Sequence, residues 1–141
     1  RPVLGFACPR SEVSGRRLWG WGRDCFDTPE RFFQRFFIAN YCPLCFLEDS
    51  GRNLTPDKLP PRQREPLLAA CDKALRQTVE HFKPRLIVGI GTFAETRAKI
   101  ALDGVDVRIG RILHPSPASP TANKDWARQA TAQLRSLGVR V

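Results

Sequence analysis

Hydrophobic residues in the central part of the chain follow first a helical and then a strand-like pattern. From about Gln63 to Lys83, apolar side chains return at steps of three and four residues, which predicts an amphipathic helix. Pro84 ends this helix, because proline cannot continue it. Residues 85–90 are rich in β-branched side chains and have no alternation, which is typical of a strand covered on both faces in a parallel sheet.

The alternation of elements continues toward the C-terminus. Gly91-Thr92 leads into a predicted helix that Gly104 ends. Residues 105–113 then alternate largely between apolar and polar positions, which predicts a strand that ends directly before His114. The last helix is expected to begin near Asn123, a residue suited to an N-cap.

The N-terminal part of the chain predicts a helix, a strand and a loop. Thr28 is a suitable N-cap with Pro29 at the first helical position. The phenylalanines of residues 32–37, together with Trp19 and Trp21, are expected in the core. Residues 37–40 are read as a short buried strand, and residues 50–56 as a polar loop rich in turn formers.

Strands and helices that alternate in this way predict an α/β fold with a parallel sheet between layers of helices. In such sheets, ligands bind beyond the carboxyl ends of the strands. Asn40, Gly91-Thr92 and His114 each follow a predicted strand, so we expect them at one edge of the sheet.

Charge narrows the choice of partner. The 141 residues include 23 Lys and Arg against 14 Asp and Glu, a formal net charge of +9. This excess favours a polyanion such as DNA or RNA, although membrane surfaces and acidic proteins also attract basic chains. No apolar run approaches the roughly 18 residues of a membrane span, and residues 1–3 are unlike a signal peptide, so the sequence predicts a soluble, intracellular protein.

The chain has no methionine and begins in a loop-like segment, which predicts a fragment or a processed product. Its five cysteines are an odd number and fit a reducing compartment better than a disulfide scaffold. Cys42 and Cys45 form a Cys-x-x-Cys pair, which leaves a metal or redox site open as an alternative. No second such pair is present, so buried, reduced cysteines are the favoured interpretation and no metal or cofactor is expected.

The segment after His114 is a stiff loop. His114-Pro115-Ser116-Pro117-Ala118-Ser119-Pro120 holds three prolines, which fix φ and remove backbone donors. A preordered loop loses little entropy when it enters a nucleic-acid duplex, whereas a simple connector between a strand and a helix would have the same composition.

Four motifs in register add a family resemblance. They are residues 40–44 (NYCPL), 50–56 (SGRNLTP), 114–117 (HPSP) and 122–124 (ANK). Together they resemble the single-strand-selective monofunctional branch of the uracil-DNA glycosylase superfamily, in the same order from Arg1 almost to Val141. The resemblance implies a three-layer α/β/α fold and the C-terminal part of one domain over residues 1–141, without the first strand of the sheet.

The resemblance implies two residues that contact uracil. Asn40 would read the base, because its amide offers an acceptor to N3–H and a donor to O4, where cytosine presents the opposite pattern. His114 would donate a hydrogen bond to O2 and so stabilise the charge on the departing base, which makes it the catalytic residue.

The resemblance also implies residues that contact DNA. The His114 loop would act as a wedge that helps to extrude the nucleotide, although Ala118 stands where the family often has arginine. The segment 50–64 would contact phosphates. The DNA-contacting residues expected on this basis, with the helix start at residues 91–92 included, are Ser50, Gly51, Arg52, Asn53, Lys58, Arg62, Arg64, Gly91, Thr92, Ser116, Pro117, Ala118, Ser119 and Lys124.

The implied function is a DNA glycosylase of base excision repair that hydrolyses the N-glycosidic bond of uracil in single- or double-stranded DNA. No matched motif supplies the family's water-positioning asparagine, so that group is expected outside this chain. Such a protein would be a monomer without cofactors, in the nucleus of a eukaryote or the cytoplasm of a bacterium. The alternative is a non-catalytic nucleic-acid-binding module or an inactive fragment.

Overall fold

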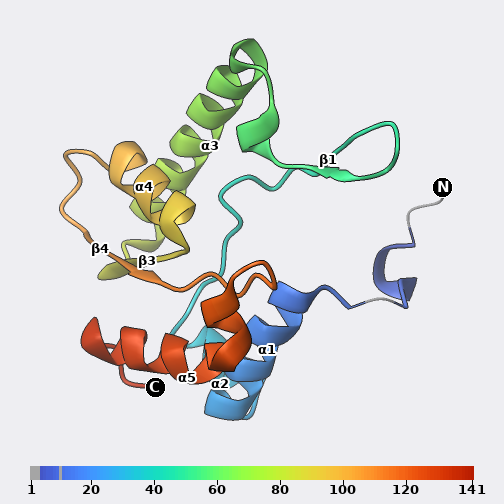
Figure 1. The fold of residues 1–141 in the computed structure, drawn as a ribbon. Helices are drawn as coiled ribbons and strands as arrows, with labels where there is room; N and C mark the ends of the chain where they lie inside the picture. Colours follow the sequence, from blue (N-terminus) through green and yellow to red (C-terminus); the bar gives the residue numbers. More distant parts are fainter. Residues whose placement is uncertain (1–3, 10) are drawn as a thin grey trace. The chain divides into compact units, whose positions relative to one another are not determined.

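A computed structural model describes residues 4–9 and 11–141. Their contacts divide the chain into two compact units. The first comprises the described residues up to Phe37, residues 90–92 and Arg111–Val141, and the second comprises Ile38–Gly89 and Phe93–Gly110. Figure 1 shows the course of the chain, and each unit is described by itself below.

The first unit is built from helices. It contains a 3-10 turn, η1 (Gly5–Ala7), and the helices α1 (Val13–Phe26), α2 (Pro29–Phe33) and α5 (Pro120–Ser136), of which α1 packs against both α2 and α5. Thr28 Oγ1 accepts a hydrogen bond from Arg31 N at 3.4 Å, with Pro29 at the first helical position. The expected start of α2 is therefore confirmed, whereas α1 was not predicted.

An aromatic cluster forms the core of this unit. The ring of Trp21 lies edge-on to Phe26 at 5.9 Å and to Trp126 of α5 at 6.5 Å. The expectation that Trp19, Trp21 and the phenylalanines of residues 32–37 lie in the core is wrong for Trp19, Phe33 and Phe37, which are 49%, 54% and 59% exposed. Trp19 and Trp21 lie two positions apart on α1, on nearly opposite faces, so only one of them can face the core.

The last helix begins earlier than expected. Ser119, and not Asn123, caps α5, and its Oγ accepts a hydrogen bond from Ala122 N at 3.3 Å. The helix is interrupted at Asp125, whose φ is 169° and whose Oδ1 accepts from Arg128 N at 3.1 Å. Two caps six residues apart thus start α5 and restart it after the interruption, and Asn123 is free for another role.

The second unit contains a hairpin, a long helix and most of helix α4 (Thr92–Ala101). Strands β1 (Phe46–Leu47) and β2 (Asn53–Leu54) pair in antiparallel fashion, and η2 (Pro56–Lys58) leads into α3 (Pro61–Phe82). The expected helix over residues 63–83 is confirmed. The expected strand over residues 37–40 is wrong, because this segment belongs to no helix or strand and only Ile38 in it is half-buried.

A β-α-β crossover carries the parallel part of the fold. Strands β3 (Leu86–Ile90) and β4 (Arg108–Ile112) pair in parallel, and α4 (Thr92–Ala101) connects them. Strand β4 starts later than the alternation predicted, because residues 105 and 107 precede it and pack on a core of Val79, Ala98, Ala101 and Leu102. The α/β class expected from the sequence is confirmed.

Gly89 allows β3 and α4 to approach closely. A Cβ atom at this position would meet the backbone N of Glu95 and lie 2.7 Å from its Cα. We expect Gly89→Ala in the full-length protein to lower the free energy of unfolding by about 1–3 kcal/mol, because backbone cannot move aside as a flexible side chain can. Urea unfolding measures this loss.

Gly20→Ala is the matched control for Gly89→Ala. Gly20 lies inside α1 and has open space around its Cβ position. Alanine there should be neutral or stabilise by up to about 1 kcal/mol, because it removes the glycine penalty in a helix. Equal stability of the two variants would contradict the close approach at Gly89.

Candidate functional site

His114 follows strand β4, and both backbone polar groups of the residue before it are hydrogen-bonded. The preceding residue, Leu113, donates its backbone N–H to Gln133 Oε1 at 2.7 Å. Its carbonyl oxygen accepts from Trp126 Nε1, also at 2.7 Å. Two side chains of α5 therefore hold the backbone that carries the exposed imidazole.

The loop of residues 114–119, called the His114 loop below, is held by a guanidinium group. Arg17 Nη1 donates to the carbonyl oxygens of Pro115 at 3.1 Å and Ser116 at 3.4 Å. Its Nη2 donates to Asn123 Oδ1 at 2.8 Å, and Asn123 Nδ2 donates to Pro117 O at 2.9 Å. Sequence reasoning missed Arg17, because 98 residues separate it from Pro115 and no local pattern links them.

Two exposed residues form the tip of this loop. Ser119 N donates to Ser116 O at 3.1 Å and Ala118 N donates to Ser116 Oγ at 3.2 Å, which closes a turn. Pro117 and Ala118 lie exposed in that turn. The hydroxyls of Ser116 and Ser119 accept hydrogen bonds from the chain's own backbone, so each keeps its proton available for an outside acceptor.

Gly91 lies against His114. Its φ is +93°, its N–H donates to Ile112 O at 2.9 Å, and a Cβ atom there would lie 3.0 Å from His114 Cβ. The neighbouring Thr92 accepts a hydrogen bond at Oγ1 from Arg111 Nη1 at 2.9 Å. The structure thus brings Gly91-Thr92 and His114 together at the ends of β3 and β4, as expected from the sheet rule.

We expect Gly91→Ala to displace the imidazole and to lower stability. The substitution adds both a left-handed backbone penalty of about 1 kcal/mol or more and a contact with His114 that must relax. Gly104→Ala separates the two effects, because Gly104 has φ +76° but open space around its Cβ position. The melting temperature should fall further in Gly91→Ala than in Gly104→Ala, and equal changes would contradict the contact.

Glu12, in the first unit, places a negative charge near His114. Its carboxylate caps α1 and accepts from Ser14 N at 2.9 Å and from Gly15 N. Partial burial acts to raise the pKa of Glu12, but these backbone donors outweigh it, and with a small contribution from His114 they hold the pKa below its usual value.

Asn40 lies in the second unit and is exposed. Residues 37–40 do not form the expected strand. The prediction that a strand end places Asn40 at the edge of the sheet is therefore wrong. The next residue, Tyr41, is half-buried and held by hydrogen bonds to α3.

The expected phosphate-contacting loop is the turn of the β1–β2 hairpin. Glu48 N donates to Arg52 O and Gly51 N donates to Glu48 O, both at 2.8 Å, with Gly51 at φ +80°. The turn exposes Ser50, Gly51, Arg52 and Asn53. Arg52 Nε lies 3.4 Å from Glu48 Oε2, an exposed pair that solvent screens strongly.

The cationic residues expected to contact phosphates differ in exposure. Lys58 and Arg62 are exposed around the start of α3, and Lys124 is exposed on α5. Arg64 is half-buried and already engaged within the protein. Lys58 and Arg62 are therefore better placed than Arg64 to reach an external anion.

The cysteines do not follow the expectation that all are buried. Cys71 is buried, Cys42 is intermediate, and Cys8, Cys25 and Cys45 are exposed. Burial and the neighbouring Cys42 thiol raise the pKa of Cys71 to about 11, so it remains a thiol at neutral pH.

The described residues show neither a cluster of metal ligands nor a membrane-spanning helix. Within residues 4–9 and 11–141, no group of three His, Cys, Asp or Glu side chains is arranged to hold a metal ion. In the same part of the chain, none of the helices combines the length and the apolar character needed to cross a bilayer.

The chain matches a known protein family over most of its length. Residues 4–135 match the model of the uracil DNA glycosylase superfamily. The chain belongs to this superfamily. The match covers the His114 loop, Gly91 and Asn40 together, so the resemblance seen in four motifs of the sequence is confirmed.

Curated members of the superfamily are similar over nearly the whole chain. The chain is 51% identical over 141 residues to the single-strand selective monofunctional uracil-DNA glycosylases of Rattus norvegicus and Mus musculus, and 50% identical to that of Bos taurus. Each alignment covers 99% of this chain and 50–52% of the relative. The chain thus spans about half the length of the curated relatives it matches.

Proposed function

We propose that the protein containing this chain is a monofunctional uracil-DNA glycosylase of base excision repair. It binds DNA, extrudes a uracil nucleotide and hydrolyses the N-glycosidic bond to leave an abasic site. The observation that carries this proposal is the imidazole of His114, held at the end of β4 between Gly91 and a loop that Arg17 and Asn123 keep rigid. The names of the relatives support the same activity.

In this mechanism His114 donates a hydrogen bond to uracil O2. Negative charge develops on the base as the glycosidic bond breaks, so a fixed donor stabilises the transition state more than the ground state. The hydrogen bonds at Leu113 and Pro115 hold the backbone on either side of His114. The imidazole would therefore need little rearrangement as the glycosidic bond breaks. A neutral imidazole suffices, because no proton needs to be transferred.

Asn40 reads the base in the proposed mechanism. Its amide oxygen accepts from uracil N3–H and its amide nitrogen donates to O4. Cytosine presents the opposite pattern, which leaves polar groups unpaired in a dry pocket. Water, rather than a lysine of this chain, is the proposed nucleophile.

Exposed groups of both units would contact the DNA backbone and the gap in the duplex. Pro117 and Ala118 form the tip that enters the space left by the flipped nucleotide, a step that costs least in single-stranded DNA. Phosphates would be neutralised by Arg52, Lys58, Arg62 and Lys124, with neutral donors at Ser50, Asn53, Thr92, Ser116 and Ser119. Gly51 would contribute through the turn that exposes its neighbours, because its own N–H is donated to Glu48 O. Reaction on DNA implies a nuclear location in a eukaryotic cell.

Base release tests the proposal directly. The full-length protein is incubated with a single strand that contains one uracil, and free uracil is separated by chromatography. We expect uracil to be released and the strand to stay intact until alkali cleaves the abasic site. Salt-dependent DNA binding without base release would instead support a non-catalytic nucleic-acid-binding module.

A further inference from the structure

The segment that carries Asn40 has no regular structure of its own. Residues 36–45 belong to no helix or strand, so no ladder of backbone hydrogen bonds fixes them. An amide that reads a base must keep its oxygen and nitrogen in fixed places, because a half-turn would present the complement of cytosine. Something outside the segment must therefore hold Asn40.

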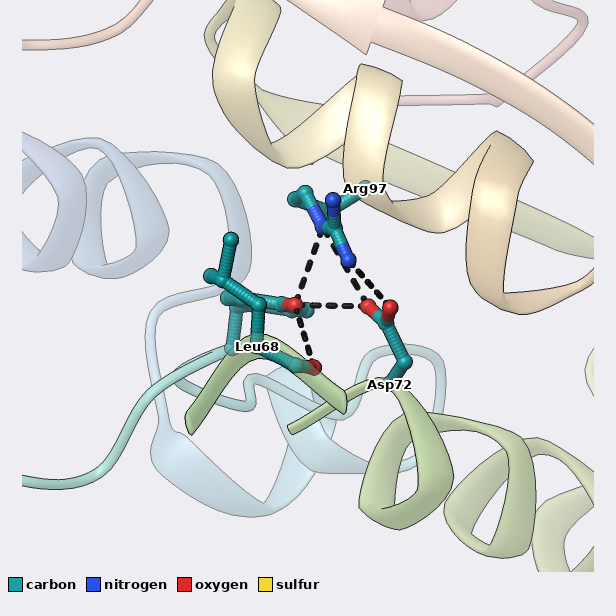
Figure 2. Close-up of polar contacts among 4 residues, drawn as sticks. Leu68, Asp72 and Arg97 are labelled. Carbon is teal, nitrogen blue, oxygen red and sulfur yellow. Dashed lines mark hydrogen bonds and ion pairs between the residues drawn. The ribbon is translucent and has the colours of Figure 1, made fainter. Parts of the chain in front are cut away.

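The adjacent residue, Tyr41, reaches across to α3 and α4. Its hydroxyl lies 2.6 Å from Asp72 Oδ1 and 3.1 Å from Leu68 O, both on α3. It accepts a hydrogen bond from Arg97 Nε of α4 at 3.0 Å. The hydroxyl therefore has a polar partner on each of the two helices, and Figure 2 labels these partners, Leu68, Asp72 and Arg97.

The two charged partners of the Tyr41 hydroxyl, Asp72 and Arg97, also form an ion pair with each other. Arg97 Nη2 contacts Asp72 Oδ2, and the two side chains are only 16% and 18% exposed. Figure 2 shows Arg97 and Asp72 facing each other, with Leu68 beside them. A pair so shielded from solvent is screened little by salt, and loss of either partner would leave a charge without compensation.

The ring of Tyr41 is held as well as its hydroxyl. The Phe93 ring lies edge-on to it with centroids 5.6 Å apart, and the Arg97 guanidinium lies 5.9 Å from its centroid. Burial and the Asp72 acceptor raise the pKa of Tyr41 above its usual value, so the hydroxyl stays protonated at neutral pH. The contacts of the ring and of the hydroxyl together restrict the conformations open to the Tyr41 side chain.

From these contacts we propose that Tyr41, Asp72 and Arg97 form a positioning network that holds Asn40 for the recognition of uracil. One peptide bond joins Asn40 to Tyr41. Contacts that hold the ring and the hydroxyl of Tyr41 therefore also restrict the backbone from which the Asn40 amide projects. The three residues act through Asn40 and do not touch the substrate. This inference rests on the proposed function for its meaning, and on the contacts within the second unit for its geometry.

The substitution that tests the network is Tyr41→Phe in the full-length protein. It keeps the ring and its contact with Phe93 but removes the hydroxyl. The loss of one hydrogen-bonded group should lower single-turnover uracil release by roughly three- to tenfold. The ratio of uracil to cytosine release should fall as well, because a mobile amide reads both bases.

A second arm separates positioning from general stability. Tyr41→Phe is combined with Asn40→Ala, and the loss caused by removing the hydroxyl should disappear in that background. Hydrogen exchange of residues 38–43, followed by mass spectrometry, should rise in Tyr41→Phe. Thr131→Val is the matched control, because it removes one hydroxyl that accepts from Trp21 Nε1 at 3.0 Å in the first unit.

The outcomes distinguish the network from the proposed function. An equal loss of activity with and without Asn40, or unchanged release and exchange in Tyr41→Phe, overturns the positioning role. A parent protein that releases no uracil contradicts the proposed function instead. In that case raised exchange at residues 38–43 still supports the network, and unchanged exchange overturns it.

Discussion

Replacing His114 by alanine is expected to lower the rate of uracil release by about 10²–10³-fold, the usual effect of removing one donor to a developing oxyanion. The imidazole is exposed and its backbone is held by Gln133, Trp126 and Arg17 through neighbouring residues, so truncation should leave the fold intact. Single-turnover rates on a strand with one uracil, together with the melting temperature, measure the two effects separately.

His81→Ala is the control for this substitution. The chain has two histidines, and His81 lies exposed near the end of α3, where it contacts only the ring of Phe82 among the described aromatic residues. Its removal should leave the rate unchanged. A His114→Ala protein that releases uracil at the parent rate would remove His114 from the mechanism.

Replacing Asn40 by alanine is expected to abolish most of the preference for uracil over cytosine. Sites that hydrogen-bond the distinguishing groups of a substrate discriminate by about 10⁴ or more, and this preference depends on the amide. Most of the change should appear as slower release of uracil, since alanine offers no partner to N3–H or O4. Competing strands with uracil or cytosine at one position measure the ratio.

Gln77→Ala provides the matched loss of an exposed amide elsewhere in the second unit. It should leave both the rate and the ratio unchanged. If Asn40→Ala keeps the parent ratio, another residue reads the base. In that event the Tyr41 network would also lose its role in recognition.

The sequence predicted the elements whose signals are local. The helix over residues 61–82 has a long apolar face and a proline after its end, and β3 is rich in β-branched residues and has no polar side chain. Thr28-Pro29 is a start signal that depends only on adjacent residues. Such features need no knowledge of distant contacts, and the structure confirms them.

The features that sequence reasoning missed depend on tertiary contacts. Residues 37–40 have the composition of a strand but form none, and Asn123 has the composition of a cap but bonds to Arg17 and Pro117 instead. The Tyr41 network joins three residues that are 31, 25 and 56 positions apart. No periodicity links residues at such separations, so only the folded structure reveals them.

We propose that this chain carries the base-reading and leaving-group parts of a uracil-DNA glycosylase. The most direct measurement compares free-base release by the full-length protein from two identical single strands that differ only in one uracil or cytosine. We predict release of uracil without cytosine, and loss of that release in His114→Ala but not in His81→Ala. Absence of free uracil with the parent protein, or equal release of both bases, would contradict the account.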